Sequence, residues 1–264
     1  MLLLGCLHTF NGCPTGVDLS NSSDQIDLSA INENEMNLFS NCNIGIRVDN
    51  AAARIKYNNF ENCSGAIFLN ETEYTEILEN TINGGNLGLE ATDAGDFYMH
   101  HNLVGLTTPV SLGAFIFRCE GYTFEKNEVD SKRGAVWPWF SSGRIHENKL
   151  GEGSQPGTSI LQFFSSDEIF DNIIKADRNG IEAQGVFMNN NIHHNTINSD
   201  GTGCRIEGGS DDNVVTNNII ESALDAVLYT ASGNNETSCN NLTSGEDCID
   251  INIGSDTHAI IENN

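Results

Sequence analysis

The sequence has few basic residues, and it lacks the short motifs that mark common metal and nucleic-acid sites. Lys and Arg total 12 against 37 Asp and Glu, which gives the 264-residue chain a formal net charge of −25. Recognition of phosphates needs clustered Lys and Arg, so we expect no nucleic-acid partner. The eight cysteines contain no Cys-x-x-Cys pair, which leaves a zinc site without support. No segment is apolar over a length that could span a membrane.

The acidic excess has two interpretations. It is either a solvated surface or a set of ligands for a divalent cation, which makes Ca²⁺ a candidate cofactor. No Asp-x-Asp-x-Asp loop of the usual calcium-binding kind is present. The sequence therefore favours a solvated acidic surface and leaves the cofactor open.

A repeat of about 23 residues runs along almost the whole chain. Its clearest copy is Ile192–Ile197, which consists of an apolar residue, two variable residues, Asn, one variable residue and a second apolar residue. A period this steady marks a solenoid, in which each repeat is one structural unit stacked on its neighbours. The central asparagines are Asn11, Asn34, Asn58, Asn80, Asn102, Asn127, Asn148, Asn172, Asn195, Asn218, Asn240 and Asn263.

A second segment follows each Asn after about ten residues. It begins with Gly or a small residue and continues with alternating apolar positions, as in Gly180-Ile181-Glu182-Ala183 and Gly203-Cys204-Arg205-Ile206. Such alternation is typical of half-buried strands. We therefore predict an all-β chain, with two or three short strands in each coil of a parallel β-helix. The Asn tolerates the left-handed conformation of a tight bend, and stacked Asn amides can bond each other as a ladder.

This pattern resembles that of the right-handed parallel β-helix family, the pectin-lyase-like superfamily, over roughly residues 8 to 264. The resemblance implies one right-handed parallel β-helix domain, 1–264, of about 11–12 coils with an Asn ladder. We expect it to lack native end caps. It also implies that the Asn turn lies between the second and third strands of each coil. The Gly-led segment is then the first strand, whose outer face commonly carries the substrate groove in this family.

Charged residues gather on and beside the Gly-led strands. We expect Ile181, Cys204 and Ala226 to point inward, and Glu182, Arg205 and Val227 to point outward in three adjacent coils. The alternative to a functional site is a surface ladder of ion pairs, each of which contributes little stability. The cations in this set are Lys132, Arg133, Arg178 and Arg205, and the carboxylates singled out with them are Glu182 and Glu207.

In a β-eliminating lyase of this family, Lys or Arg neutralises the uronate carboxylate or takes the adjacent proton. We assign that role to Arg205, Lys132, Arg133 and Arg178, with Glu182 and Glu207 as their partners or as cation ligands. No Gly-His-Gly or Asp-Pro-His-Glu motif of the named enzyme types is present.

Aromatic residues concentrate where the repeat is expanded. Longer loops run from Gly105 to Gly113 and from Gly151 to Gly157, and we expect them to form one wall of a groove. The aromatic side chains either stack in the core or form a platform for sugars. We assign Trp137, Trp139 and Tyr229 to substrate contact. The aromatic set is Phe115, Phe117, Trp137, Trp139, Phe140, Phe163 and Phe164.

The variable positions of the Asn frame carry most of the histidines. His100-His101 and His193-His194 lie four coils apart, on the order of 19 Å. Only His100, His101 and His146, with Glu125 and Glu147, are close enough in the predicted coils to form one site. We predict no metal site among them.

The cysteines fit an oxidising compartment by their even number. Cys42 and Cys63 are expected to be adjacent in stacked coils, and Cys204 and Cys248 to be buried and unbonded.

The predicted function is that of a carbohydrate-active protein in the extracellular space, the periplasm or at the cell surface. A polysaccharide lyase acting on an acidic polysaccharide is our first expectation, with a glycoside hydrolase as the other enzymatic option. The competing hypothesis is a non-catalytic, adhesin-like or structural β-helix segment of a larger protein. The oligomeric state is not predicted.

Overall fold

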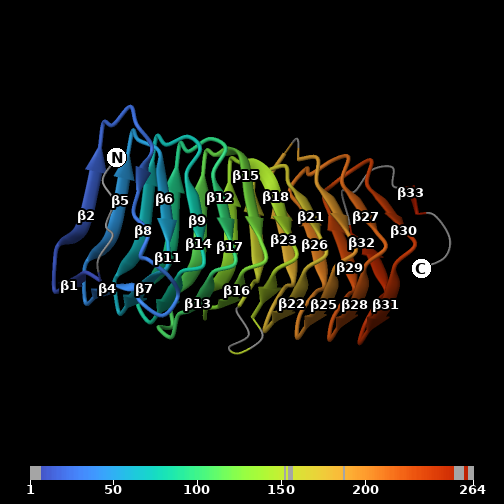
Figure 1. Ribbon diagram of the computed structural model, residues 1–264. Coiled ribbons are helices and arrows are strands. Elements are labelled where there is room, and N and C mark those ends of the chain that lie inside the picture. Colours follow the sequence, from blue (N-terminus) through green and yellow to red (C-terminus); the bar gives the residue numbers. More distant parts are fainter. Residues whose placement is uncertain (1–6, 152, 154–156, 187, 253–258, 261–264) are drawn as a thin grey trace.

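The chain forms a parallel β-helix in which each coil contributes one strand to each of three sheets (Figure 1). The structure is a computed structural model that describes residues 7–151, 153, 157–186, 188–252 and 259–260. Each sheet has 11 parallel strands, and within the described residues no helix occurs. Strand pairing joins each coil to the next, so residues one repeat apart lie side by side.

Sheet A follows the Asn turn. Its strands are β1 (Thr9–Asn11), β4 (Asn37–Ser40), β7 (Asn58–Glu61), β10 (Thr81–Asn83), β13 (Leu103–Gly105), β16 (Glu128–Asp130), β19 (Lys149–Leu150), β22 (Ile173–Ala176), β25 (Thr196–Ser199), β28 (Ile219–Ser222) and β31 (Asn241–Ser244).

Sheet B contains the Gly-led segments. Its strands are β2 (Thr15–Ser20), β5 (Ile44–Asp49), β8 (Gly65–Asn70), β11 (Leu87–Thr92), β14 (Leu112–Phe117), β17 (Gly134–Trp139), β20 (Ile160–Phe163), β23 (Ile181–Gln184), β26 (Cys204–Glu207), β29 (Val227–Thr230) and β32 (Ile249–Ile251).

Sheet C precedes the Asn turn. Its strands are β3 (Ile26–Asp27), β6 (Ala53–Lys56), β9 (Glu76–Leu78), β12 (Tyr98–His100), β15 (Glu120–Glu125), β18 (Ser142–His146), β21 (Glu168–Phe170), β24 (Asn191–His193), β27 (Val214–Thr216), β30 (Glu236–Ser238) and β33 (Ala259–Ile260). The order B, C, A within each coil places the Asn turn between the second and third strands, as expected.

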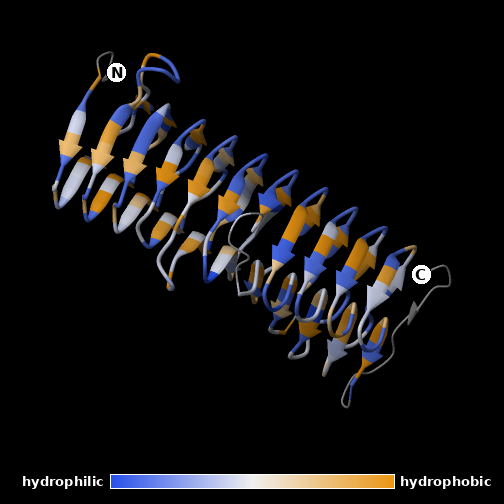
Figure 2. Cartoon of the chain, turned by 90° about the horizontal axis from the view of Figure 1, so that it is seen from below, coloured by the Kyte–Doolittle hydropathy of each residue, from blue (hydrophilic) through white to orange (hydrophobic). Residues whose placement is uncertain are grey.

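The core is built from the inward residues of all three sheets. Polar and apolar residues alternate along many strands, which Figure 2 shows as alternating blue and orange. Parallel register stacks like residues on like, so that Ile46, Ile67 and Leu89 form one buried column on sheet B. Sheet C contributes a similar column that includes Ile77, Met99 and Phe124. The half-buried alternation read from the sequence therefore corresponds to one continuous core.

The Asn ladder is present, and the predicted column from Asn80 to Asn218 is confirmed. Each Asn amide donates to the side-chain oxygen of the Asn one coil further on, at 2.9–3.2 Å. The same oxygen also accepts from the backbone N–H of the preceding Asn, as Asn172 does from Asn148 at 3.0 Å. These bonds satisfy polar groups that would otherwise be buried without partners.

The first members of the ladder differ from the prediction. The ladder begins at Asn37, which is buried and donates to Asn58 at 2.9 Å. Asn34 is exposed in a longer connection, because the repeat frame is displaced there by three residues. Asn11 lies at the end of β1 opposite Ser40 rather than at an inward turn. Asn263 lies outside the described residues.

Glycine recurs at the start of the sheet B strands because the backbones of successive coils approach each other closely there. A Cβ on Gly113 would lie 2.4 Å from the carbonyl oxygen of Ala135 in the next coil, and one on Gly203 would lie 2.6 Å from that of Ala226. Neither contact is possible for a real Cβ atom. The repeated Gly is therefore a packing requirement between coils.

A second ladder lies at the entrance to sheet C. The side-chain oxygens of Asn190, Asn213 and Asn235 each accept from the backbone N–H one coil earlier, at 2.8–3.1 Å. Asp167 occupies the first position of this ladder and is buried. The sequence contained this signal as a period of 22–23 residues, but the stronger Asn frame concealed it.

The cysteine predictions are confirmed except at one position. Cys42 and Cys63 are buried neighbours in adjacent coils, and burial together with contact to Cys42 raises the pKa of the Cys63 thiol to about 11. Cys204 is buried and free, as expected, but Cys248 is exposed. The prediction for Cys248 was wrong because the strand after it, β32, is itself only partly covered. All seven cysteines among the described residues are free thiols.

Candidate functional site

The outer face of sheet B consists of two parallel columns of side chains. The first runs through Glu90, Phe115, Trp137, Leu161, Glu182, Arg205 and Leu228. The second runs through Thr92, Phe117, Trp139, Phe163, Gln184, Glu207 and Thr230. The expected outward residue Val227 is instead fully buried, and Leu228 pairs with Arg205. The Asp225-Ala226 turn shifts this strand by one residue relative to the prediction.

The aromatic residues form a band on the outer face of sheet B rather than a stack in the core, and their contact with sugars stays a prediction. Phe115 and Phe117 on β14 and Trp139 on β17 are partly exposed, whereas Pro138 between the tryptophans points into the core. Trp139 contacts Phe115 and Phe163 edge-on or tilted, at centroid separations of 5.2 and 5.4 Å. Phe140 and Phe164 extend the band at the turn, stacked 5.1 Å apart. A ring per coil along one face suits stacking against a chain of sugar rings.

One pocket of about 370 Å³ lies over the first part of this band. Its carboxylate is Glu90, and burial raises the pKa of that group. Glu90 was not singled out from the sequence, although its place in the same outward column as Glu182 could have identified it by alignment of the repeats. The pocket is lined by Asn86, Leu87, Glu90, Val110, Leu112, Phe115, Arg133, Trp137 and Trp139.

A second pocket, of about 460 Å³, adjoins the first because Arg133 and Trp137 line both. It brings together five of the residues predicted from sequence, namely Lys132, Arg133, Trp137, Arg178 and Glu182. Its other lining residues are Pro109, Gly157, Thr158, Leu161 and Gln184. Pro109 and Val110 come from the first expanded loop, and Gly157 ends the second.

The cations of this pocket are placed by backbone pairing between coils. The Gly157 N–H donates to the Lys132 carbonyl at 3.2 Å, and the Arg178 N–H donates to the Gly157 carbonyl at 2.7 Å. Lys132 and Arg178 therefore lie two coils apart with a glycine between them, and the Arg178 side chain comes within 4.0 Å of the place that a Cβ on Gly157 would occupy. The Arg133 guanidinium packs over the Trp137 ring at 4.6 Å. Trp137 is only 7% exposed, because this contact and its neighbours cover it.

Glu182 is the buried acid of the second pocket. It is 5% exposed, and its carboxylate accepts from the Asn179 amide at 2.7 Å and from the Thr158 hydroxyl at 3.3 Å. The Gln184 amide also donates to it. Three donors therefore hold this carboxylate toward the pocket in a fixed orientation.

Arg205 and Glu207 lie one coil beyond Glu182 and Gln184 on the same face, outside both pockets. They pair with each other, with Arg205 nitrogens 2.9 and 2.7 Å from a Glu207 oxygen. Tyr229 does not reach this face. It is fully buried at an inward position and its hydroxyl bonds to Thr237, which excludes the predicted contact with substrate.

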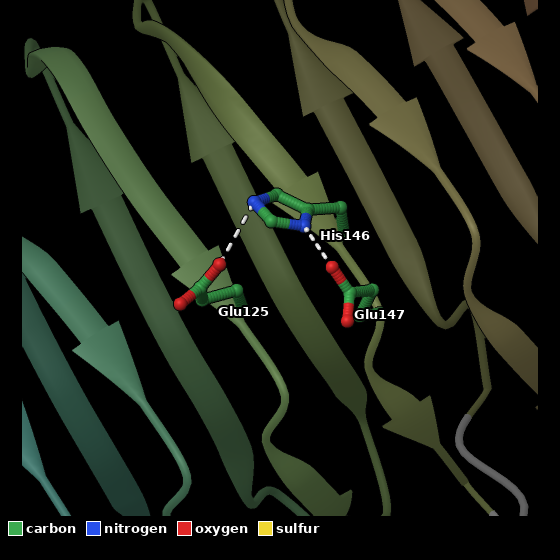
Figure 3. A group of neighbouring side chains, drawn as sticks. All are labelled: Glu125, His146 and Glu147. Carbon is green, nitrogen blue, oxygen red and sulfur yellow. Dashed lines mark ion pairs between the residues drawn. The ribbon is translucent and has the colours of Figure 1, made fainter.

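The outer face of sheet C carries a separate cluster of His and Glu side chains. In Figure 3, His146 lies between two carboxylates, with Nε2 3.2 Å from Glu125 and Nδ1 3.4 Å from Glu147. The two ring nitrogens face different carboxylates, so one ion cannot use both. The Lys126 ammonium is 3.9 Å from Glu125 and 3.6 Å from Glu147, so it offsets part of their negative charge. These side chains are engaged in ion pairs with one another and with Lys126, although one ligand atom from each of Glu125, His146 and Glu147 lies within 4.8 Å of the others.

Comparisons with known proteins agree with this architecture. The family model "Right handed beta helix region" matches residues 8–150, and the model "Periplasmic copper-binding protein (NosD)" matches residues 105–258. A search of curated protein sequences gave no match. Within the described residues there is no helix with the length and apolar character needed to cross a membrane.

Two solved structures resemble the chain at low sequence identity. DFA-IIIase from Arthrobacter chlorophenolicus A6 without its lid has a TM-score of 0.58 and 12% identity, and the match covers 89% of this chain and 75% of that one. The Agl-KA catalytic domain has a TM-score of 0.56 and 13% identity, with 90% of this chain covered. This chain spans about half, 53%, of that second protein. At these identities the likeness shows a shared fold.

Proposed function

Because the chain belongs to the family of right-handed β-helix proteins, we propose that the outer face of sheet B binds an acidic polysaccharide and cleaves it by β-elimination. The observation that carries the proposal is the pair of adjoining pockets, one aromatic and one lined by three cations. An aromatic floor suits the flat faces of sugar rings, and the cations suit their carboxylates.

The geometry of the face fits an extended chain. The outward columns run parallel to the axis of the helix, from Glu90 on β11 to Arg205 on β26. That distance is five coil spacings, roughly 24 Å at about 4.8 Å per coil. A polymer that lies along this line contacts the aromatic band first and the cationic pocket next. Arg205 and Glu207 extend the same groove by one coil.

The proposed reaction uses the cations in two ways. One cation neutralises the uronate carboxylate and so stabilises the negative charge that forms when the adjacent C5 proton is removed. A second of these side chains, acting in its deprotonated and therefore uncharged form, takes that proton, the C4–O bond breaks, and the leaving oxygen receives a proton from water. A C4–C5 double bond remains in the product. In this proposal the roles fall to Lys132, Arg133 and Arg178, which line the second pocket.

The two carboxylates that the sequence suggested as cation ligands, Glu182 and Glu207, are already engaged by other side chains. Glu182 already accepts from three donors, and Glu207 is paired with Arg205. Ca²⁺ takes six to eight oxygen ligands, so it would have to displace these contacts. The cationic side chains therefore carry the neutralising role in this proposal.

We place the protein outside the cytoplasm, in the periplasm or the extracellular space. The description of the second matching family as periplasmic supports this placement, and polymeric acidic sugars are met outside the cell.

The test measures binding and turnover on a panel of acidic and neutral oligosaccharides. Binding is measured by titration calorimetry and β-elimination by the ultraviolet absorbance of the unsaturated product. Arg178→Ala should weaken binding of an acidic oligosaccharide by roughly 10- to 100-fold, as expected for loss of a charge-assisted hydrogen bond of about 1.5–3 kcal/mol.

The matched control is Arg144→Ala. Arg144 is also an exposed Arg with a nearby carboxylate, Glu168, but it lies on sheet C. The control should bind the oligosaccharide as the parent does. Equal losses in both variants would show a general charge effect and contradict the groove. Binding without an unsaturated product would favour a non-catalytic surface protein, and no binding of any acidic sugar would overturn the proposal.

A further inference from the structure

Glu90 is a carboxylate that stands among aromatic rings without a partner. In the outward column of sheet B it lies between Phe68 on β8 and Phe115 on β14. It is half-buried and lines the pocket of about 370 Å³, and among the described residues it makes no hydrogen bond or ion pair. Burial raises the pKa of this carboxyl group, and no neighbouring cation opposes that effect. Its carboxylate therefore takes its hydrogen bonds from solvent or from a ligand.

The other acid of the groove has the opposite surroundings. Glu182 lies four coils further along the same column, where three side chains donate to it and three cations line the pocket around it. Arg133 is one of these cations and lines both pockets. Its guanidinium packs over the Trp137 ring at 4.6 Å, and in the described part of the chain it forms no ion pair with Glu90. The two pockets therefore differ in the charge that they can accept.

The aromatic floor beside Glu90 is fixed by its neighbours. A Cβ on Gly134 would overlap the indole nitrogen of Trp137, so the glycine leaves room for this ring. The same nitrogen donates to the Thr158 carbonyl at 3.5 Å. Because the ring is already held in place, a ligand that packs on it loses little side-chain entropy on binding.

The same pocket also contains a hydrogen-bond donor. The Asn86 side-chain oxygen accepts from the Thr108 hydroxyl at 2.9 Å, which orients the amide and leaves its NH₂ group to donate. Val110 and Leu112 add apolar surface from the expanded loop and the strand that follows it. A carboxylate acceptor, an amide donor and an aromatic floor together complement the hydroxyls and the flat face of an uncharged sugar.

We propose that this pocket is a subsite for a neutral sugar, and that the polymer bound along sheet B carries neutral sugars interspersed with its uronates. The inference rests on the proposed function, because it divides the same groove into a neutral and an acidic subsite. Glu90 accepts from sugar hydroxyls, whereas a uronate in the same place would bring two carboxylates together in a half-buried pocket. An unpaired like charge of this kind rejects the wrong ligand. A polymer made of uronates alone is therefore the poorer ligand.

The two subsites are spaced for one chain. Glu90 is on β11, and Lys132 and Arg133 directly precede β17, two coils further on. Two coil spacings amount to roughly 10 Å at about 4.8 Å per coil. An extended polymer along the outer face of sheet B can therefore place a neutral sugar beside Glu90 and a uronate beside the cations at the same time.

The tryptophans of the chain report directly on the neutral subsite. The sequence has two, Trp137 and Trp139, and both line this pocket, so intrinsic fluorescence follows its occupation. The probes are oligomers of galacturonate, glucuronate and mannuronate. Each is used unmodified, after reduction of part of its carboxyl groups to primary alcohols, and after complete reduction. Reduction removes charge and leaves the ring stereochemistry unchanged, so each series is internally matched.

Glu90→Gln isolates the charge, because Gln has nearly the same shape and still bonds to hydroxyls. For at least one series the parent should bind the partly reduced oligomer roughly 10-fold more tightly than the unmodified one. In Glu90→Gln this preference should fall to about two-fold, since the unmodified oligomer is no longer repelled. The control is Glu128→Gln, at an exposed position on sheet A, and it should keep the preference of the parent.

Arg178→Ala separates this inference from the proposed function. It should weaken binding of the unmodified and partly reduced oligomers and leave the fluorescence response to the fully reduced oligomer unchanged. A parent that binds unmodified and partly reduced oligomers equally, or a preference that survives Glu90→Gln, overturns the neutral subsite and leaves the acidic groove intact. Binding of fully reduced oligomers without binding of any acidic one supports the subsite and contradicts the proposed function. Absence of binding by every probe overturns both.

Discussion

Asp167 is a buried acid whose protonation should make the stability of the fold depend on pH. Its carboxylate accepts from the Tyr122 hydroxyl and from the Gln162 amide, both at 2.7 Å, inside the core. Burial raises the pKa of Asp167 from 3.8 to about 7, against the opposing effect of these hydrogen bonds. Burial beside this carboxylate also raises the pKa of the Tyr122 phenol.

The sign of the effect follows from proton binding. Between about pH 4 and pH 7 the folded state keeps the proton on Asp167, whereas the unfolded state has lost it. The folded state then binds one more proton than the unfolded state, so its stability falls as the pH rises through this range. Each pKa unit corresponds to about 1.4 kcal/mol, which gives a total near 4 kcal/mol for this shift.

Asp167→Asn isolates this contribution from those of the other carboxylates. Asn already occupies the next positions of the same ladder, at Asn190 and Asn213, so the side chain fits. Urea unfolding of parent and variant at pH 5, 6, 7 and 8 gives the free energy of unfolding of each. The parent should lose about 2–3 kcal/mol relative to the variant between pH 5 and 7, and little more above that. Parallel curves would refute the assignment of a raised pKa to Asp167.

Two further predictions concern packing between coils, and urea unfolding measures both. Asn148→Ala removes the hydrogen bonds of one ladder step and leaves buried main-chain groups unpaired. It should therefore lower the free energy of unfolding by about 4 kcal/mol. Its control is Asn198→Ala at an exposed position, which should change the free energy of unfolding by less than about 0.5 kcal/mol. Gly113→Ala places a Cβ 2.4 Å from a carbonyl oxygen and should cost about 1–3 kcal/mol, while Gly95→Ala, with its nearest atom at 3.9 Å, should be nearly neutral. Equal effects within either pair would contradict the reasoning.

The fold was readable from the sequence because its strongest signals are local and periodic. The Asn frame and the Gly-led alternation each repeat in nearly every coil, so an error at one position does not displace the rest. The prediction failed where a connection changed length, as before Asn37, and where a strand shifted by one residue, as at Val227. A shift of one residue turns every side chain of a strand to the opposite face of the sheet, and the sequence alone does not determine the register of such a strand.

The candidate site was predicted in part. The cations around Gly157 and the buried Glu182 follow from the column order of the repeat, and the structure brings them together. Tyr229 was misplaced because an inward Tyr with a hydroxyl partner has the same sequence pattern as an outward one. The paired orientation of His193 and His194 depends on a left-handed turn and on Glu168 one coil away, which spacing alone does not reveal.

The parallel register has a consequence for how such a protein can change its length. Because every coil pairs with the next through equivalent positions, duplication or loss of one complete repeat preserves both ladders and every column. Such an event alters only the number of coils between two sites, in steps of about 4.8 Å. Sites on either side of the added or lost coil therefore stay intact, whichever sheet carries them, and only their separation along the axis of the β-helix changes.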